Sequence, residues 1–293
     1  MTRLSFLPSL SALLLLLSSS TCWAQTKVSK EQINKEFSLT ADASRSTLAL
    51  YNVHGSITVQ GYAGNKVVVE ATKTIWASND KILEVGKSEA KLDFVQRNDT
   101  VLVYMAAPYD SRPRRNYRNN NDCCNQREID YRYQFEFVVK VPYELNLHLS
   151  TVNKGSVLVE NVTGPLQVYN VNGSITLNNV KGTTKARTVN GNVEATYAAN
   201  PAGASTYNTI NGQIRVKYPS SLGADMHFKS MNGAFYTDFA NAEMLPTQVT
   251  KNKEGRGGGT VYKITKETAV RIGKGGPDFR FETLNGNVTV SKL

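Results

Sequence analysis

The sequence predicts an all-β protein whose main part is a parallel β-solenoid. This is a stack of two-strand coils of about 18–21 residues, with flanking strands and one short helix near residues 79–92. Three observations predict this fold class: a nine-residue repeat of glycine, a period-two alternation of apolar residues within each repeat, and two turn chemistries that alternate along the chain. The composition, 40% hydrophobic and 20% charged with a formal net charge of +10, excludes disordered, collagenous and polytopic membrane classes.

The glycine repeat organises the middle of the chain. Five glycines follow one another at intervals of nine residues: Gly155, Gly164, Gly173, Gly182 and Gly191. The second and fourth residues after each glycine are mostly small and apolar, and their neighbours are mostly polar. This alternation is typical of a strand with one buried face. We therefore expect an aliphatic core without a cavity, containing Val157, Val159, Leu166, Val168, Ile175, Leu177, Val193, Ile214 and Val216. The seventh residue is also expected to point inward: Val162, Val171, Val180 and Val189.

Two kinds of turn alternate between these strands. One kind carries asparagine before glycine, at positions 153–155, 172–173, 190–191, 211–212 and 232–233; the other lacks it, at 163–164, 181–182, 202–203 and 222–223. Asn-Gly between strands also favours antiparallel hairpins, so a meander is the alternative fold. A solenoid accounts better for the fixed spacing, because equivalent turns stack and their asparagine side chains can form ladders. The same register recurs near both ends of the chain, after Gly55 and Gly286.

The flanking segments contain further predicted elements. Strands are expected at 37–39, 47–51, 56–59, 67–76, 101–105 and 133–141. Ser78-Asn79-Asp80 is a helix cap, and the face of the helix that follows is expected to contain Ile82, Leu83, Val85 and Ala90. Residues 107–131 are interpreted as a surface-loop insertion between two paired strands, and residues 251–260 as a second loop.

The first 24 residues have the plan of a secretory signal peptide. A basic start at Arg3 precedes an apolar run, and small residues end at Ala24, after which we expect cleavage. A lipoprotein signal with Cys22 as the acylated residue is the minor alternative, because Ser19 occupies the position where that signal needs an aliphatic residue. Residues 25–293 are expected to form a single solenoid domain without a further membrane-spanning stretch. Such a protein is exported to the periplasm, the outer surface or the exterior.

No cofactor or metal site is predicted. The calcium-binding nonapeptide repeat has the same period, but it needs an aspartate ligand, and residues 155–195 contain none. The adjacent Cys123 and Cys124 are interpreted as a loop dithiol without special function. The three histidines have no second ligand at metal spacing and are interpreted as surface or turn residues: His54, His148 and His227.

Four stretches of sequence carry a family resemblance. They are His54-Gly55-Ser56-Ile57-Thr58-Val59 with Gly61 and Gly64, Val139–Pro142 leading into Thr151–Gly155, Asn172–Leu177, and Thr283–Val290. In these motifs the chain resembles the bacterial putative-adhesin family of secreted β-solenoid proteins, also known as a domain of unknown function. The resemblance covers nearly the whole mature chain. It implies a parallel β-solenoid in the cell envelope with an adhesive role, and it offers no catalytic motif to transfer.

The predicted function is that of an exported, non-catalytic cell-envelope protein, an adhesin or interaction scaffold whose partner is an envelope glycan or a surface protein. A β-helix carbohydrate-active enzyme or an anionic-polysaccharide-binding protein is the alternative. An enzyme of that class needs two carboxylates that face each other. The outward carboxylates of the regular coils are few, chiefly Glu160 and Glu194, and they belong to different coils.

The arginine-rich stretch within 107–131 is the candidate partner-binding loop. Its candidate contacts are Arg112, Arg114, Arg115, Tyr117 and Arg118. Arginine binds carboxylate and phosphate groups in a bidentate manner, so an acidic partner is expected. Four acidic residues interrupt the stretch, which leaves a solubilising loop as the alternative, and export argues against nucleic acid as the partner.

Overall fold

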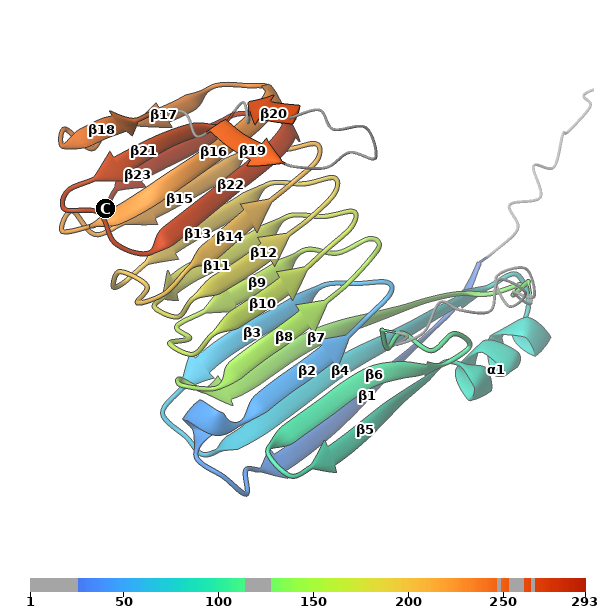
Figure 1. Cartoon of the computed structure of the whole chain (residues 1–293). Helices are drawn as coiled ribbons and strands as arrows, with labels where there is room; N and C mark the ends of the chain where they lie inside the picture. Colours follow the sequence, from blue (N-terminus) through green and yellow to red (C-terminus); the bar gives the residue numbers. More distant parts are fainter. Residues whose placement is uncertain (1–25, 114–127, 247–248, 253–260, 265–266) are drawn as a thin grey trace, which may run out of the picture.

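The computed structural model describes residues 26–113, 128–246, 249–252, 261–264 and 267–293. Within these residues, two sheets of ten and eleven strands face each other, and the strands of each sheet follow one another along the axis of the stack (Figure 1). The predicted signal peptide and the two loop cysteines lie outside the described residues. Among the helices described, none is long and apolar enough to cross a membrane.

The first sheet contains, in spatial order, β1 (Lys27–Ser38), β4 (Lys66–Ala77), β7 (Arg132–Pro142), β3 (Ile57–Tyr62), β9 (Val157–Glu160), β11 (Ile175–Val180), β13 (Val193–Tyr197), β15 (Ile214–Tyr218), β23 (Val288–Lys292) and β17 (Phe235–Thr237). The second sheet contains β18 (Ala242–Leu245), β21 (Thr268–Ile272), β16 (Ala224–Asn232), β22 (Asp278–Asn285), β14 (Ser205–Asn208), β12 (Thr184–Arg187), β10 (Leu166–Tyr169), β8 (Asn146–Ser150), β2 (Thr47–Tyr51), β6 (Thr100–Ala107) and β5 (Lys91–Arg97). A separate antiparallel pair is formed by β19 (Val249–Asn252) and β20 (Val261–Ile264), and the short helices are η1 (Ala43–Arg45) and α1 (Asp80–Glu89).

The central coils confirm the predicted solenoid. Each coil contributes one strand to each sheet, and neighbouring coils pair in parallel, so that Ile175 lies between Val157 and Val193. Strands β10 and β11, which a meander would pair antiparallel, belong to opposite sheets. The residues predicted at the second and fourth positions are buried: Val157, Val159, Leu166, Val168, Ile175, Leu177, Val193, Ile214 and Val216.

The seventh residue after each glycine is buried at one edge of the stack and partly exposed at the other. Val162 and Val180, at the edge opposite the Asn-Gly turns, are buried as predicted. Val171 and Val189, at the asparagine edge, are partly exposed, so the prediction is wrong for them. The residue before each of them, Asn170 or Thr188, takes the inward position instead.

Two columns of hydrogen bonds hold the asparagine edge together. In the outer column, asparagine side chains of successive coils form a ladder of amide hydrogen bonds, as in the donation from Asn190 Nδ2 to Asn172 Oδ1 at 2.8 Å. In the inner column, buried polar side chains donate to glycine carbonyls of the neighbouring coil, as Thr188 Oγ1 does to Gly173 at 2.8 Å. Only glycine fits at these turns, because a Cβ at Gly191 would collide with the carbonyl oxygen of Gly173.

The core changes character along the stack. Small aliphatic residues fill the central coils, but the C-terminal coils are filled by stacked aromatic rings: Tyr197, Tyr207, Tyr218, Phe279 and Phe281. The prediction of an aliphatic core is therefore wrong at this end. The nine-residue repeat stops at Gly191, and beyond it the third inward position of a strand, which is valine in earlier coils, becomes Tyr197 or Tyr218.

The first and last repeat layers in the sequence, β2–β3 and β22–β23, are inserted into the stack and do not lie at its ends. The layer formed by β2 and β3 lies between the β6–β7 layer and the β8–β9 layer, although β7 and β8 are consecutive in sequence. Likewise the layer formed by β22 and β23 lies between β14–β15 and β16–β17. The repeat predicted at both ends is thus present, and its place in the stack comes from long-range pairing.

The flanks agree with most of the predicted elements. Asn79 caps α1 by accepting a hydrogen bond from the backbone N of Ile82 at 2.9 Å, and Ile82 packs against the core. Val85, expected on the packed face, is exposed. The segment 107–131 does not join paired strands as predicted, since β6 and β7 belong to opposite sheets. Alternation marks a half-buried strand, but it does not identify the sheet to which the strand belongs.

Candidate binding face on the second sheet

The outer face of the second sheet contains aromatic and basic side chains in neighbouring strands. The register places Tyr104, Tyr51, Ser150, Tyr169 and Arg187 in one row across β6, β2, β8, β10 and β12. A second row contains His148, Gln167 and Lys185. Because alternate residues of a strand point to the same face, both rows lie on the outside, opposite the buried Leu149 and Val168. We call these two rows the aromatic–basic face.

Three aromatic side chains form the middle of this face. The His148 ring lies between two tyrosines, with centroid distances of 5.2 Å to Tyr51 and 5.6 Å to Tyr169. The hydroxyl of Tyr51 is 3.3 Å from His148 Nδ1. Burial lowers the pKa of His148 and nearby Lys185 lowers it further, while burial and then Tyr169 raise the pKa of Tyr51. Both shifts favour the uncharged form of the group at neutral pH. The three rings are tilted against one another, with interplanar angles of 71° between Tyr51 and His148 and 55° between His148 and Tyr169, and they form a weakly polar cluster that we call the platform.

Two cations flank the platform on β12. Lys185 Nζ lies 6.0 Å from the ring centroid of Tyr169, and Arg187 is the register neighbour of Tyr169. Both side chains belong to exposed residues, and neither forms an ion pair with another described residue. Their charge is therefore available to an anionic ligand.

Arg112 is the one predicted loop contact that falls within the described residues. Its guanidinium lies over the Tyr104 ring at 4.2 Å and also binds Asp110, with 2.6 Å between Nη2 and Oδ2. Ser111 holds this segment against the sheet, because its hydroxyl donates to the carbonyl of Tyr51 at 2.8 Å. The structure thus places Arg112 at the edge of the aromatic–basic face. The other four predicted contacts lie outside the described residues: Arg114, Arg115, Tyr117 and Arg118.

The residues of the aromatic–basic face were not predicted as a site. His148 was expected to be a surface or turn residue, and the outward positions of the repeat strands were expected to be mostly polar, so Tyr169 was not singled out. The signal that could have found the face is the coil register itself. Residues in equivalent positions of stacked coils are neighbours, so an outward tyrosine in one coil lies beside the outward residues of the coils stacked on either side of it.

The two carboxylates considered for catalysis lie on the other sheet. Glu160 accepts a hydrogen bond from Asn178 at 3.3 Å, and Glu194 forms an ion pair with Arg215 at 2.7 Å. The register places Glu160 beside Asn178, and Glu194 beside Thr176. These carboxylates therefore do not face each other as a glycosidase pair would.

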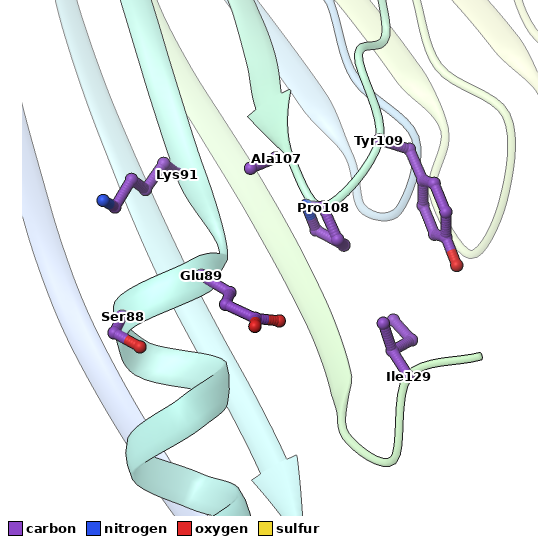
Figure 2. A pocket seen from close by; sticks show the side chains of 7 residues that line it. All are labelled: Ser88, Glu89, Lys91, Ala107, Pro108, Tyr109 and Ile129. Carbon is purple, nitrogen blue, oxygen red and sulfur yellow. The ribbon is translucent and has the colours of Figure 1, made fainter. Parts of the chain in front are cut away.

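A pocket of about 340 Å³ lies between the end of α1 and the end of β6 (Figure 2). Its lining residues are Ser88, Glu89, Lys91, Ala107, Pro108, Tyr109 and Ile129. Glu89 accepts a hydrogen bond from the hydroxyl of Tyr131 at 3.1 Å, and Figure 2 shows Lys91 extending away from Glu89. The pocket thus lies at a packing seam between helix, strand and loop.

Comparisons with known proteins give likenesses of fold. No family model matches the sequence, and no curated protein matches it. The solved structures that it resembles include a putative cell adhesion protein from Clostridium sporogenes, with a TM-score of 0.40 and 10% identity over 90% of this chain and 100% of that one. A putative adhesin from Bacteroides fragilis has a TM-score of 0.30 and 12% identity over 90% of this chain and 98% of that one. A putative lipid binding protein from Parabacteroides distasonis has a TM-score of 0.29 and 10% identity over 89% and 96%. The expected likeness to bacterial putative adhesins is confirmed.

Proposed function

We propose that the chain is an exported, non-catalytic interaction scaffold of the cell envelope, and that it binds an acidic glycan on the aromatic–basic face. In this proposal residues 1–24 are the export signal and residues 25–293 act as one adhesin-like domain. The observation that carries the proposal is the Tyr51–His148–Tyr169 platform, with the cations Lys185 and Arg187 beside it that form no ion pair with another described residue.

The chemistry of the face suits a sugar polymer that carries carboxylates. Sugar rings have apolar C–H faces that pack against aromatic rings, and aromatic side chains offer a large, rigid contact area. Uronate carboxylates form charge-assisted hydrogen bonds with Arg and Lys. The rows run across the strands, so successive groups are about 4.8 Å apart, a spacing close to the length of one sugar ring. A long sheet face of this kind binds an extended chain through many contacts of moderate strength.

The acidic groups near the face support binding without hydrolysis. Asp93 accepts a hydrogen bond from the Tyr104 hydroxyl at 2.6 Å, and Asp110 binds Arg112. Each carboxylate is therefore engaged with a partner of its own. Glycoside hydrolysis needs two carboxyl groups on opposite sides of the scissile bond, and this pair serves to hold Tyr104 and Arg112 in place.

The test is a binding assay with the purified mature protein, polygalacturonate as the acidic glycan and dextran as the neutral one. We expect binding to polygalacturonate that weakens as salt is added and little binding to dextran. The double variant Lys185→Gln/Arg187→Gln should bind about tenfold more weakly or worse, since each charge-assisted contact contributes about 1.5–3 kcal/mol. Tyr169→Ala should also weaken binding.

Lys217→Gln is the matched control. Lys217 is an exposed outward residue of β15 on the first sheet, so its charge is comparable but its location is different. Its counterpart on the proposed face is the single variant Lys185→Gln. Equal losses in these two single variants would mean that net charge alone drives binding, which would contradict the proposed face. Release of reducing sugar ends from polygalacturonate by the intact protein would contradict the non-catalytic function.

The arginine-rich loop is proposed as a second contact beside the face. Arg112 already lies at the Tyr104 end of the platform. Arg112→Gln should therefore weaken binding to polygalacturonate by a few fold. A variant in which residues 114–127 are replaced by a short Gly-Ser linker tests the rest of the loop. If this variant binds as well as the intact protein, those loop residues make no contribution and the binding site lies on the strands and Arg112.

A further inference from the structure

Five Asn-Gly pairs occur at the asparagine edge: Asn172-Gly173, Asn190-Gly191, Asn211-Gly212, Asn232-Gly233 and Asn285-Gly286. Asn-Gly is chemically labile, because the backbone nitrogen of glycine can attack the side-chain carbonyl carbon of asparagine without hindrance from a side chain of its own. The reaction requires freedom of the asparagine side chain and of the glycine nitrogen. The ladder restricts the side chain, so the five pairs can be compared by how firmly the fold holds them.

Four of the pairs are held from both sides. Asn211, for example, donates to Asn190 Oδ1 at 2.8 Å and accepts from Asn285 Nδ2 at 2.7 Å. Asn172, Asn190 and Asn285 also make one bond to each neighbour in the ladder. The attacking nitrogen is engaged as well in three of them, since Gly191, Gly212 and Gly286 each donate a backbone hydrogen bond at 3.0 Å.

Asn232 occupies the end of the ladder. It donates to Asn285 Oδ1 at 2.8 Å, and no described residue donates to its own Oδ1. Strand β16 pairs with β21 only over Ala224–Phe228, so this second neighbour does not reach Asn232. Within the described residues the backbone nitrogen of Gly233 has no acceptor, and both residues of the pair are exposed.

We propose that Asn232 is a site of spontaneous deamidation in the folded protein. The Gly233 nitrogen attacks Cγ of Asn232, the bond from Cγ to Nδ2 breaks, and ammonia leaves with the proton of the Gly233 amide. The product is a succinimide. One water molecule then opens the ring at either carbonyl and leaves aspartate or isoaspartate at position 232. The reaction consumes water and needs no other reactant.

The modification changes the last layer of the stack. A carboxylate cannot donate to Asn285 Oδ1, so the final ladder bond is replaced by repulsion between two oxygens. Isoaspartate also adds a methylene to the backbone, which displaces the carbonyl that accepts from Gly286 N at 3.0 Å. The β16–β17 layer should therefore loosen with the age of the protein, while the layers below it remain paired. This inference is independent of the proposed glycan binding.

The experiment measures deamidation at all five pairs in one sample. The native protein is incubated in mildly alkaline buffer, digested at intervals, and analysed by mass spectrometry for the mass increase at each asparagine. The same incubation in urea exposes every pair equally. We expect Asn232 to react at least several-fold faster than the other four in the native state, and the five rates to converge in urea. An Asn232 rate no higher than that of Asn211 in the native protein would overturn the proposal.

A variant provides a second readout. Asn232→Gln keeps an amide but would have to form a less favourable six-membered ring, so the acidic charge variant that accumulates in the wild-type protein should be absent on isoelectric focusing. An acidic band that appears at the same rate in Asn232→Gln would assign the reaction to another residue and contradict the proposal. Asn232→Asp, which imitates the product, should increase hydrogen exchange in β17 without changing that in β11.

Discussion

Tyr197, Tyr207 and Tyr218 place three hydroxyl groups in the middle of the C-terminal core. Burying a hydroxyl is unfavourable unless it finds a partner. Here the hydroxyls form a chain, with 2.6 Å between those of Tyr197 and Tyr207, 3.0 Å between those of Tyr207 and Tyr218, and a hydrogen bond of 2.5 Å from Tyr197 to Thr184. The rings also stack, so one set of residues supplies apolar contact and a satisfied polar network.

This tyrosine chain should make the protein sensitive to alkali. Burial raises the pKa of Tyr197 to about 12, and raises the pKa values of Tyr207 and Tyr218 well above 10.0. A folded-state pKa above the unfolded value stabilises the fold fully below the unfolded pKa, and this stabilisation is lost as pH rises through the folded pKa. We expect the free energy of unfolding, measured by urea denaturation, to be steady up to about pH 10 and to fall toward pH 12.

Tyr207→Phe tests whether the linked tyrosine hydroxyls cause the loss of stability at high pH. It removes the central hydroxyl and should lower stability at neutral pH by about 1–2 kcal/mol, while reducing the slope above pH 10. Tyr236→Phe, at an exposed position, is the control and should leave the whole profile unchanged. If the free energy of unfolding of Tyr207→Phe falls with pH as steeply as that of the wild type, the tyrosine hydroxyls do not cause alkaline unfolding.

His148 provides a prediction within the aromatic–basic face. Its pKa is lowered from 6.5 by burial and by Lys185, so the neutral ring contributes stability above pH 6.5, and this contribution is lost as pH falls toward the lower folded pKa. Lys185→Gln removes the second cause and should raise the pKa of His148, which an NMR titration of the ring protons measures. Because burial remains, the value should stay below 6.5. Lys217→Gln should leave the titration unchanged; an equal shift there would point to a nonspecific charge effect.

At the scale of the element, α1 is held against the first sheet by a buried lysine. Lys73 on β4 is 7% exposed at its side chain, donates to the carbonyl of Lys87 at 2.7 Å and lies 3.3 Å from Glu31. The carbonyl groups of the last helical turn have no partner within the helix, and Lys73 satisfies one of them. Asn79 caps the other end, so contacts at both termini stabilise a helix of only ten residues.

Lys73→Met should release the end of α1. Methionine keeps the apolar stem but has no donor, so the Lys87 carbonyl loses a charge-assisted hydrogen bond that contributes about 1.5–3 kcal/mol. We expect faster hydrogen exchange of the α1 amides, with the amides of the central coils unchanged. Lys66→Met removes an exposed ion pair with Glu36 and should change stability by no more than about 1 kcal/mol. Exchange in α1 that matches the wild type would show that packing alone holds the helix.

At the scale of the whole molecule, the order of layers in space differs from the order of coils in sequence. The last coil in sequence, β22–β23, is covered by β16–β17, which precedes it in the chain. Its residues are therefore paired on both sides, as Val288 is with Ile214 and Phe235. The open edges at this end of the two sheets are formed by β17 and β18 instead, and open edges are prone to aggregation.

Two deletions separate spatial order from sequence order. Deletion of 278–293 removes the inner layer, so β16 and β17 lose their parallel partners and the C-terminal part of the stack should lose cooperative unfolding in urea. Deletion of 223–277 removes the outer layer and joins β15 to β22 directly, which leaves a continuous solenoid that should still unfold cooperatively. If the variant that lacks 278–293 unfolds as cooperatively as the variant that lacks 223–277, then β16 can pair directly with β14, and the inserted β22–β23 layer is not required to complete the stack.

The sequence by itself determined the coil. Residues 150–218 contain a short repeat in which glycine, asparagine and inward valine recur at near-constant spacing, and stacking makes equivalent residues neighbours. Pairing, burial and the asparagine ladder then follow from local information. The aromatic core was not predicted because Tyr197 and Tyr218 replace valine where the repeat ends. The inner column of Asn170 and Thr188 was missed because polar residues were assigned to the outside.

Only the tertiary structure decided the order of the terminal layers and the candidate site. Tyr51 and His148 are 97 residues apart in sequence and meet because β2 is inserted beside β8. Alternation shows that one face of a strand is buried, but any other half-buried strand could pair with it equally well by this criterion. The choice of partner depends on how whole layers fit together and on the loop closure that each pairing requires. The aromatic–basic face exists only once that choice has been made.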